Sequence, residues 1–157
     1  MLNRFQDCGI DRPFSFQNIA LTGLTNYKYD VGDWICPSVA VSILADLNKK
    51  LEPSLLNIRV FSEGIVYLDK LYNDFFDGFC MLDTQSGGIE GSLLVFVVCR
   101  IGIKQIDPMY HEAILDIFNA PCNIGFIGGK PDKAFYFVGT NGDRLLYLDP
   151  HFVKVIY

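Results

Sequence analysis

The sequence predicts an α+β fold, in which helices lie on the face of a largely antiparallel sheet. Apolar residues repeat at helical spacing in two separate stretches, at about 37–51 and 108–120. Short β-rich runs occur elsewhere, the most apolar of them over 93–99. An Asn-Gly pair at 141–142 lies between two such runs, which predicts a hairpin with a type I′ turn.

The helical segments carry start signals as well as apolar stripes. Pro37 suits the first turn of a helix, and the pair Asp107-Pro108 marks the start of another. Asp46 and Lys50 form a favourable pair four residues apart on the longest predicted helix. In chain order, we expect helices over 13–24, 37–51, 68–76 and 108–120.

The strand candidates are short and are separated by turn residues. The run 93–99 is continuously apolar, so it predicts a central strand that is covered on both faces. The stretch 77–92 is rich in glycine with a polar centre, which predicts a loop. In chain order, we expect strands over 57–61, 65–68, 93–99, 123–128, 134–139, 144–148 and 151–157.

Composition narrows the class of protein. The chain has 157 residues, so a single domain is expected, and it is 50% hydrophobic with a net charge of −5. No basic cluster supports nucleic-acid binding, and no apolar run approaches the ~20 residues of a membrane helix, so stable membrane insertion is not expected. We find no secretory signal at the N-terminus. Together with five cysteines and no C-x-x-C pair, this predicts a cytoplasmic protein with reduced thiols and neither metal nor cofactor.

Asp149-Pro150-His151 is the candidate for acid-base chemistry. In an extended chain, residues i and i+2 project from the same face, about 6.6 Å apart at Cα. A carboxylate beside an imidazole can fix its tautomer and stabilise its charged form, as in a catalytic triad. Asp-x-His also occurs often by chance, so spacing alone favours a structural or surface role for the pair.

Other candidate side chains have simpler interpretations. Cys36 precedes a predicted helix, where backbone N–H groups lower a thiol pKa, so it is either a surrogate nucleophile or a local packing residue. His111 is expected to be solvated, and Cys99 is expected to be an inert core thiol of its strand. Trp34 taken by itself suggests core packing.

Several motifs together resemble a known family. The segment Gly125 to Asp132, with Gly128-Gly129-Lys130-Pro131, continues nearly without gaps into Gly142 to His151. Upstream, Ile101 to Glu112 and the Gly32-Asp33-Trp34-x-x-Pro37-Ser38 motif match in register. Over about residues 4–47 and 93–155 the chain resembles the C-terminal half of the autophagins, the papain-like cysteine proteases of autophagy.

The resemblance implies a fold, an activity and a site. The fold would be the C-terminal, mainly antiparallel half of a papain-like protease, with flanking helices. Family members cleave a ubiquitin-like autophagy modifier after glycine and release it from its lipid conjugate. By resemblance, His151 is the general base and Asp149 orients it. Trp34 and the loop Gly129-Lys130-Pro131 would flank the glycine tail of the substrate in a narrow slot, where a side-chain-free tail fits.

One departure from the family is large. Its nucleophilic cysteine lies on a helix N-terminal to every segment matched here, and we expect that segment to be absent from this chain. The isolated chain would then be inactive and would need the missing catalytic segment as a partner. It is expected to be a fragment, a truncated isoform or a degenerate paralogue. The alternatives are a non-catalytic module that binds the modifier and an unrelated α+β scaffold.

Overall fold

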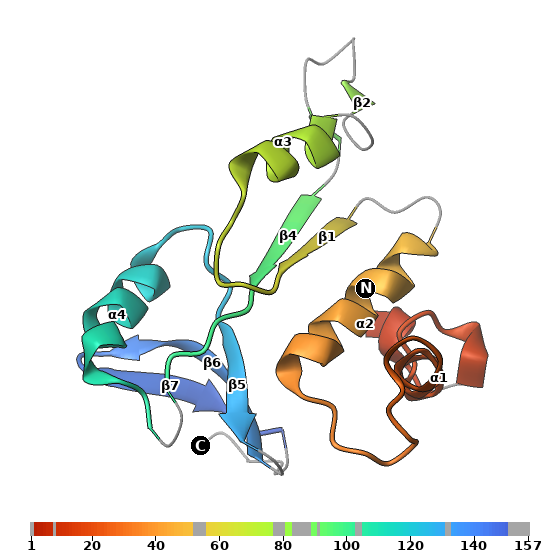
Figure 1. Ribbon diagram of the computed structural model, residues 1–157, viewed down its shortest axis with the longest axis horizontal. Coiled ribbons are helices and arrows are strands. Elements are labelled where there is room, and N and C mark those ends of the chain that lie inside the picture. The colour runs from red at the N-terminus through yellow and green to blue at the C-terminus, as the bar shows by residue number, and fades with distance from the viewer. Residues whose placement is uncertain are drawn as a thin grey trace. The chain divides into compact units, whose positions relative to one another are not determined.

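The computed structural model describes residues 2–7, 9–51, 56–76, 81–82, 89–90, 92–102, 105–130 and 133–150. The chain forms two compact units, Met1–Cys99 and Arg100–Tyr157. Figure 1 colours the first unit from red to green and the second from green to blue. The α+β class is confirmed, and each unit holds both helices and strands.

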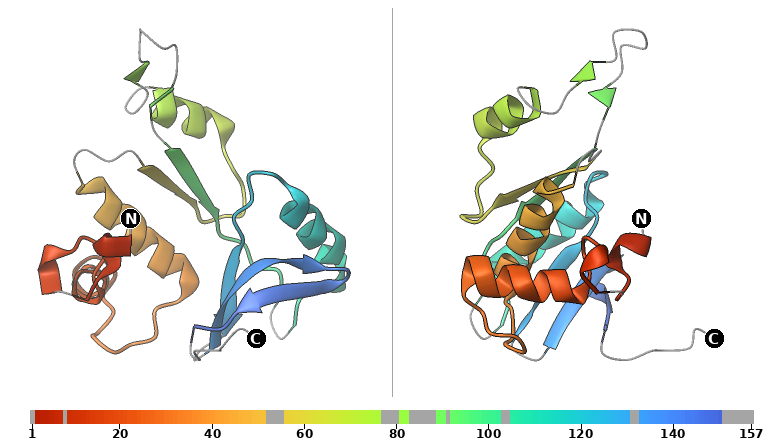
Figure 2. Two further views of the ribbon diagram at one scale, coloured as in Figure 1. Left: turned by 180° about the vertical axis from the view of Figure 1, so that it is seen from behind. Right: turned by 90° about the vertical axis from the view of Figure 1, so that its right-hand side faces the viewer.

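The first unit opens with two 3-10 turns, η1 (Leu2–Phe5) and η2 (Gly9–Asp11), and two α-helices. Helix α1 (Phe16–Tyr27) begins after Ser15, whose hydroxyl accepts a hydrogen bond from the Asn18 amide at 3.2 Å. Helix α2 (Pro37–Lys49) begins with proline at its first turn, as predicted. The two helices lie side by side in both views of Figure 2 and pack against one another.

Apolar side chains from both helices form the core of this unit. Phe14, Ile43 and Leu47 are buried, and Ile43 is completely inaccessible to solvent. Ile19 and Ile35 pack against this cluster from the α1 side and from the connecting loop. Burying a side chain of this size contributes roughly 1.5–3 kcal/mol, so this cluster stabilises the packing of α1 against α2.

The remaining elements of the first unit include two small sheets. Strand β1 (Leu56–Phe61) pairs in parallel with β4 (Ser92–Val97), and β2 (Met81–Leu82) pairs antiparallel with β3 (Ile89–Glu90). Helix α3 (Leu68–Phe76) confirms the helix expected over 68–76.

Two strand predictions in this unit are wrong. Residues 65–67 lead into α3 and form no strand. Among the described residues, β4 has only β1 beside it and its side chains are at most half-buried, so it is not a covered central strand. The loop expected over 77–92 contains β2, β3 and the start of β4.

The second unit is a helix beside a three-stranded antiparallel sheet. A 3-10 turn, η3 (Pro108–Tyr110), leads into α4 (His111–Asn119). The sheet has the order β5 (Phe126–Lys130), β6 (Lys133–Asn141), β7 (Arg144–Leu148). The strand expected over 123–128 therefore begins three residues later, and the one expected over 151–157 lies outside the described residues.

The β6–β7 hairpin is confirmed, with a different turn from the one expected. Asn141 pairs with Arg144, so the two central residues are Gly142 and Asp143. Gly142 has a φ of 62° and Asp143 does not share this sign, which is the pattern of a type II′ turn. Asn141 is the last strand residue because the register carries β6 one residue further than the sequence pattern suggested.

Aromatic rings line one face of this sheet. The rings of Phe118 on α4 and Phe126 on β5 lie 4.6 Å apart, and those of Phe135 and Tyr147 lie 4.9 Å apart. Figure 2 shows α4 running along the sheet in both views. None of the helices formed by the described residues is long and apolar enough to cross a membrane.

Candidate active site

The Trp34 loop, defined as residues 28–36, connects α1 to α2. Its first residue, Lys28, ends α1 in the left-handed conformation, with a φ of 60°. The Asp33 amide then donates to the Asp30 carbonyl at 3.0 Å, closing a turn in which Gly32 has a φ of 102°. A glycine at this turn position is favoured because a side chain disfavours a positive φ. The Asp30 amide also donates to the Asp33 carboxylate at 3.1 Å.

Trp34 follows this turn and reaches solvent. Its side chain is 38% exposed, so it is not the core residue that a lone tryptophan suggests. The next residue, Ile35, packs onto the buried helix core. The indole is therefore presented at the surface beside a residue that is anchored in the interior.

Cys36 occupies the N-cap position of α2 and is half-buried. Its Sγ lies 3.1 Å from the Ser38 hydroxyl and 4.0 Å from the Tyr29 hydroxyl. Partial burial raises the pKa of the thiol. Hydrogen bonds from Ser38, from the Val39 amide and from Tyr29 outweigh that effect and hold the pKa below its ordinary value. The sequence predicted that Cys36 lies at a helix terminus, but not that the Ser38 and Tyr29 hydroxyls contact its thiol. For Ser38 a signal existed, because a polar residue two positions after the cysteine can reach it.

A thiol protease also needs an imidazole to accept the thiol proton. Both histidines of the chain, His111 and His151, have sequence positions in the second unit. The described part of the first unit therefore provides Cys36 with hydroxyl and amide partners but no imidazole.

The second unit brings other candidate residues to one end of its sheet. Strands β5 and β7 both run antiparallel to β6, so they are parallel to each other and end on the same side. Tyr136 pairs with Ile127 on β5 and with Leu148 on β7, and Asp149 follows directly after Leu148. Asp149 thus lies at the end where Gly129 and Lys130 leave β5. At this end, the backbones of β5 and β7 are two strand spacings apart, or roughly 10 Å.

The backbone is tightly packed at this end, which we call the sheet end (Gly129, Lys130 and Asp149). Gly129 pairs with Ala134, and a Cβ on Gly129 would lie only 1.9 Å from the Lys133 carbonyl oxygen. Only glycine fits there without movement of the strand. Asp149 is half-buried. Pro131 and His151 lie outside the described residues, so the predicted Asp149–His151 contact stays a prediction.

The two remaining candidate residues, His111 and Cys99, are both exposed to solvent. His111 is exposed at the start of α4, as expected. Cys99 was expected in the core and is exposed, because β4 ends at Val97 and Cys99 lies beyond it. Within the described ranges, no group of three or more histidine, cysteine or acidic side chains gathers as metal ligands do.

An α+β chain with a glycine hairpin and an acidic residue at one sheet end fits the class of protein that the resemblance implied, a cysteine protease. The Peptidase C54 catalytic domain model matches residues 1–157, and the chain belongs to this family. The resemblance to the autophagins is thereby confirmed.

Curated relatives agree with this assignment. The chain is 34% identical over 139 residues to "Cysteine protease 1" of Neurospora crassa, covering 88% of this chain and 26% of that protein. It is 34% identical over 140 residues to "Probable cysteine protease ATG4" of Phaeosphaeria nodorum, covering 88% and 28%. It is 29% identical over 170 residues to "Cysteine protease ATG4A" of Homo sapiens, covering 94% and 42%. The chain thus spans less than half the length of each of these relatives.

Proposed function

We propose that this chain is part of a cysteine protease of autophagy that cleaves a ubiquitin-like modifier after glycine and releases it from its lipid conjugate. The observation that carries the proposal is the sheet end. There, Asp149 follows β7 at the same end of the sheet at which Gly129 lies on β5, in a chain that belongs to the Peptidase C54 family. A proteolytic site of this kind needs an oriented general base beside a slot for an extended tail.

The proposed chemistry assigns His151 and Asp149 to proton transfer. His151 takes the proton of a cysteine thiol, and the thiolate attacks the carbonyl carbon of the glycine at the cleavage point. The imidazolium then gives its proton to the leaving amine, and water hydrolyses the resulting thioester. Asp149 holds the imidazole in the correct tautomer and stabilises its charged form. By resemblance, the thiol comes from a cysteine-bearing segment N-terminal to the residues matched here.

The proposed substrate slot uses Trp34 and the loop Gly129-Lys130-Pro131. Trp34 offers a flat, partly exposed ring, and Gly129 offers backbone without a side chain. By resemblance to the family, both would flank a glycine tail, which fits a narrow slot because it carries no side chain. We propose that the slot, rather than the acid-base pair, selects glycine.

A second candidate function is a non-catalytic module that binds the same modifier. The observation that favours it is the Trp34 loop, whose ends and internal turn are held by contacts with other residues of the first unit. In this alternative the chain retains the tail-binding surface and performs no proton transfer.

Cleavage of a modifier precursor distinguishes these functions. The chain is incubated with the precursor under reducing conditions, alone and together with the cysteine-bearing N-terminal segment of a relative such as the human protein above. We expect cleavage after glycine only in the combined sample. His151→Ala should reduce it by at least about a thousandfold, and Asp149→Asn by a smaller factor.

The control variant is Cys36→Ser, which should leave cleavage in the combined sample unchanged. Cleavage by the chain alone that Cys36→Ser abolishes would make Cys36 the nucleophile and would contradict the proposed division of roles. Binding of the modifier without cleavage in the combined sample would favour the non-catalytic module.

A further inference from the structure

We propose that Tyr27 and Asp46 are positioning residues for Trp34, which hold the indole in a preformed orientation for the substrate tail. The inference rests on the proposed function and extends it to two residues of the first unit. Tyr27 is the last residue of α1 and directly precedes the Trp34 loop. Asp46 lies on α2, the helix that follows the loop. Neither residue was a candidate on sequence grounds.

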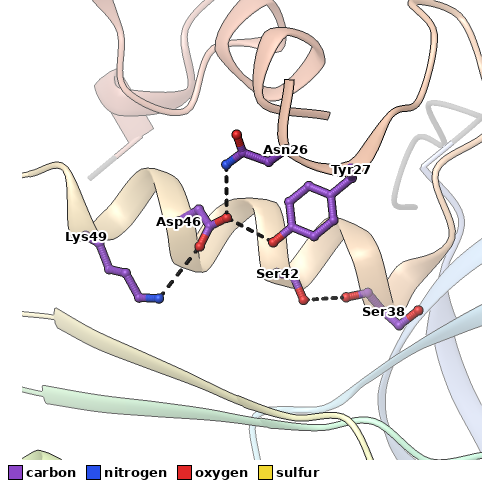
Figure 3. A network of polar contacts seen from close by, with 6 residues as sticks. All are labelled: Asn26, Tyr27, Ser38, Ser42, Asp46 and Lys49. Atoms are coloured by element: carbon purple, nitrogen blue, oxygen red, sulfur yellow. Dashed lines mark hydrogen bonds and ion pairs between the residues drawn. The ribbon is translucent and has the colours of Figure 1, made fainter. Parts of the chain in front are cut away.

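Asp46 is the centre of a polar network between the two helices (Figure 3). Its Oδ2 accepts a hydrogen bond from the Tyr27 hydroxyl at 2.9 Å and from the Asn26 side-chain amide at 3.3 Å. Its Oδ1 lies 3.7 Å from the Lys49 ammonium group on the same helix. Two of the three partners come from the final turn of α1, so the network fastens that turn to α2.

The network fixes one end of the Trp34 loop, and α2 itself fixes the other. Where α1 ends, the Lys28 and Tyr29 amides both donate to the Gly23 carbonyl. Where α2 begins, the carbonyl of Cys36 accepts from the Val39 and Ala40 amides, and its Sγ lies 4.0 Å from the Tyr29 hydroxyl across the loop. A nine-residue loop with both ends held and an internal turn has few conformations left, and we infer that this restrains its tryptophan as well.

The Tyr27–Asp46 hydrogen bond persists across physiological pH. Burial raises the pKa of the Tyr27 phenol, and the hydrogen bond to the Asp46 carboxylate raises it further. The phenol therefore stays protonated and keeps donating. A donor to a carboxylate makes a stronger bond than a neutral pair does, which suits a contact that must hold a loop end in place.

A preformed Trp34 would serve the proposed slot. A flexible tail loses conformational freedom when it binds, and a surface that is already ordered avoids adding its own loss. Because the Trp34 loop is ordered by contacts that do not touch the substrate, disrupting them should weaken binding without removing any substrate contact.

The experiment uses the fact that Trp34 is the only tryptophan of the chain. Its fluorescence anisotropy and its quenching by acrylamide report on this one side chain in the 157-residue chain. The variants are Tyr27→Phe, which removes only the hydroxyl, and Asp46→Ala, which removes the acceptor. Asp46→Asn is the conservative variant, because an amide oxygen can still accept from Tyr27. Lys49→Ala is the matched control, because it removes an Asp46 contact that does not reach α1.

We expect Tyr27→Phe and Asp46→Ala to lower the anisotropy and increase quenching, with an unchanged far-ultraviolet circular dichroism spectrum. Asp46→Asn should recover most of the wild-type signal, and Lys49→Ala should match the wild type. Binding of a ubiquitin-like modifier with a free glycine terminus should weaken about three- to tenfold in the first two variants, the size expected for losing one hydrogen bond.

Two results would overturn the inference. One is a wild-type Trp34 signal in Tyr27→Phe and Asp46→Ala; the other is a changed signal with unchanged modifier affinity. If the wild-type chain does not bind the modifier, the proposed function fails. The fluorescence series still decides separately whether Tyr27 and Asp46 hold Trp34.

Discussion

The Trp34 loop and the sheet end present their candidate residues by different physical means. Side chains anchor the loop in addition to its main-chain turn, because its neighbours pack on the buried Ile43 and its ends are fastened by hydroxyl and carboxylate groups. The main chain holds the sheet end, where Gly129 pairs with Ala134 and has no room for a Cβ. The loop should therefore be sensitive to the removal of atoms, and the sheet end to their addition.

Removing atoms beneath the loop should have the largest effect. Ile43→Ala leaves a cavity in a site with no exposed surface, and should lower the free energy of unfolding of the first unit by about 2–5 kcal/mol. Denaturant unfolding measures this change, followed by Trp34 fluorescence for the first unit and by far-ultraviolet circular dichroism for the whole chain. Ile117→Ala is the matched control, because the same truncation on α4 affects a side chain that is 47% exposed and should cost less than about 1 kcal/mol. Equal losses would contradict the assignment of the core to the α1–α2 pair.

Adding one methyl group should have different effects on stability at two adjacent glycines of β5, Gly129 and Gly128. Gly129→Ala places a Cβ 1.9 Å from the Lys133 carbonyl oxygen, and should destabilise the second unit by about 1–3 kcal/mol. Gly128→Ala is the control, since its Cβ would lie 3.8 Å from the Phe137 ring, an ordinary contact. Hydrogen exchange of the β5 and β6 amides measures both. Similar exchange rates in the two variants would show that the hairpin adjusts freely.

The sequence predicted the elements of the fold better than their pairing. Helix α2 and the β6–β7 hairpin carry local signals, an apolar stripe and a turn glycine, and both are confirmed. The parallel pairing of β1 with β4 joins segments more than thirty residues apart, and no local pattern encodes it. For the same reason, the apolar run of β4 suggested a covered central strand, since it shows β propensity but not which neighbours the strand has.

The candidate site could be predicted only in part. Motifs with fixed spacing identified Asp149, His151 and Trp34 as candidates through the resemblance, and the antiparallel register then placed Asp149 near Gly129. The Tyr27–Asp46 contact could not be predicted, because it links residues nineteen positions apart through side chains. Such contacts depend on how two helices pack, which the amphipathic pattern of each helix leaves open.

Alkaline pH should weaken the contact between Tyr27 and Asp46 that holds one end of the Trp34 loop. The pKa of Tyr27 is raised above its ordinary value of 10.0, so folding favours the neutral phenol. This contribution to stability is fully present below about pH 10 and is lost as the pH rises through the folded-state pKa. Tyr27→Phe should therefore flatten the fall in melting temperature of the first unit above pH 10. Tyr67→Phe, which removes an exposed hydrogen bond to Glu63, should flatten it less. A steeper fall in Tyr27→Phe would contradict the assigned shift.

The smallest expected effect concerns the residue where the loop begins. Lys28 is the only non-glycine residue with a positive φ among the described residues, and this conformation brings its Cβ close to the backbone. Lys28→Gly removes that strain, although glycine also has more freedom to lose on folding. The net gain in the free energy of unfolding should be about 0.5–1 kcal/mol, measured by denaturant titration.

Lys28→Ala is the control for this last change. It removes the same charge and keeps the Cβ, so it should gain nothing. If both variants were stabilised equally, the charge of Lys28 rather than its backbone conformation would limit stability. If neither changed, the left-handed turn would be compensated by the two amides that donate to the Gly23 carbonyl. A gain confined to glycine would show that the loop accepts backbone strain at its first residue to turn the chain toward Trp34.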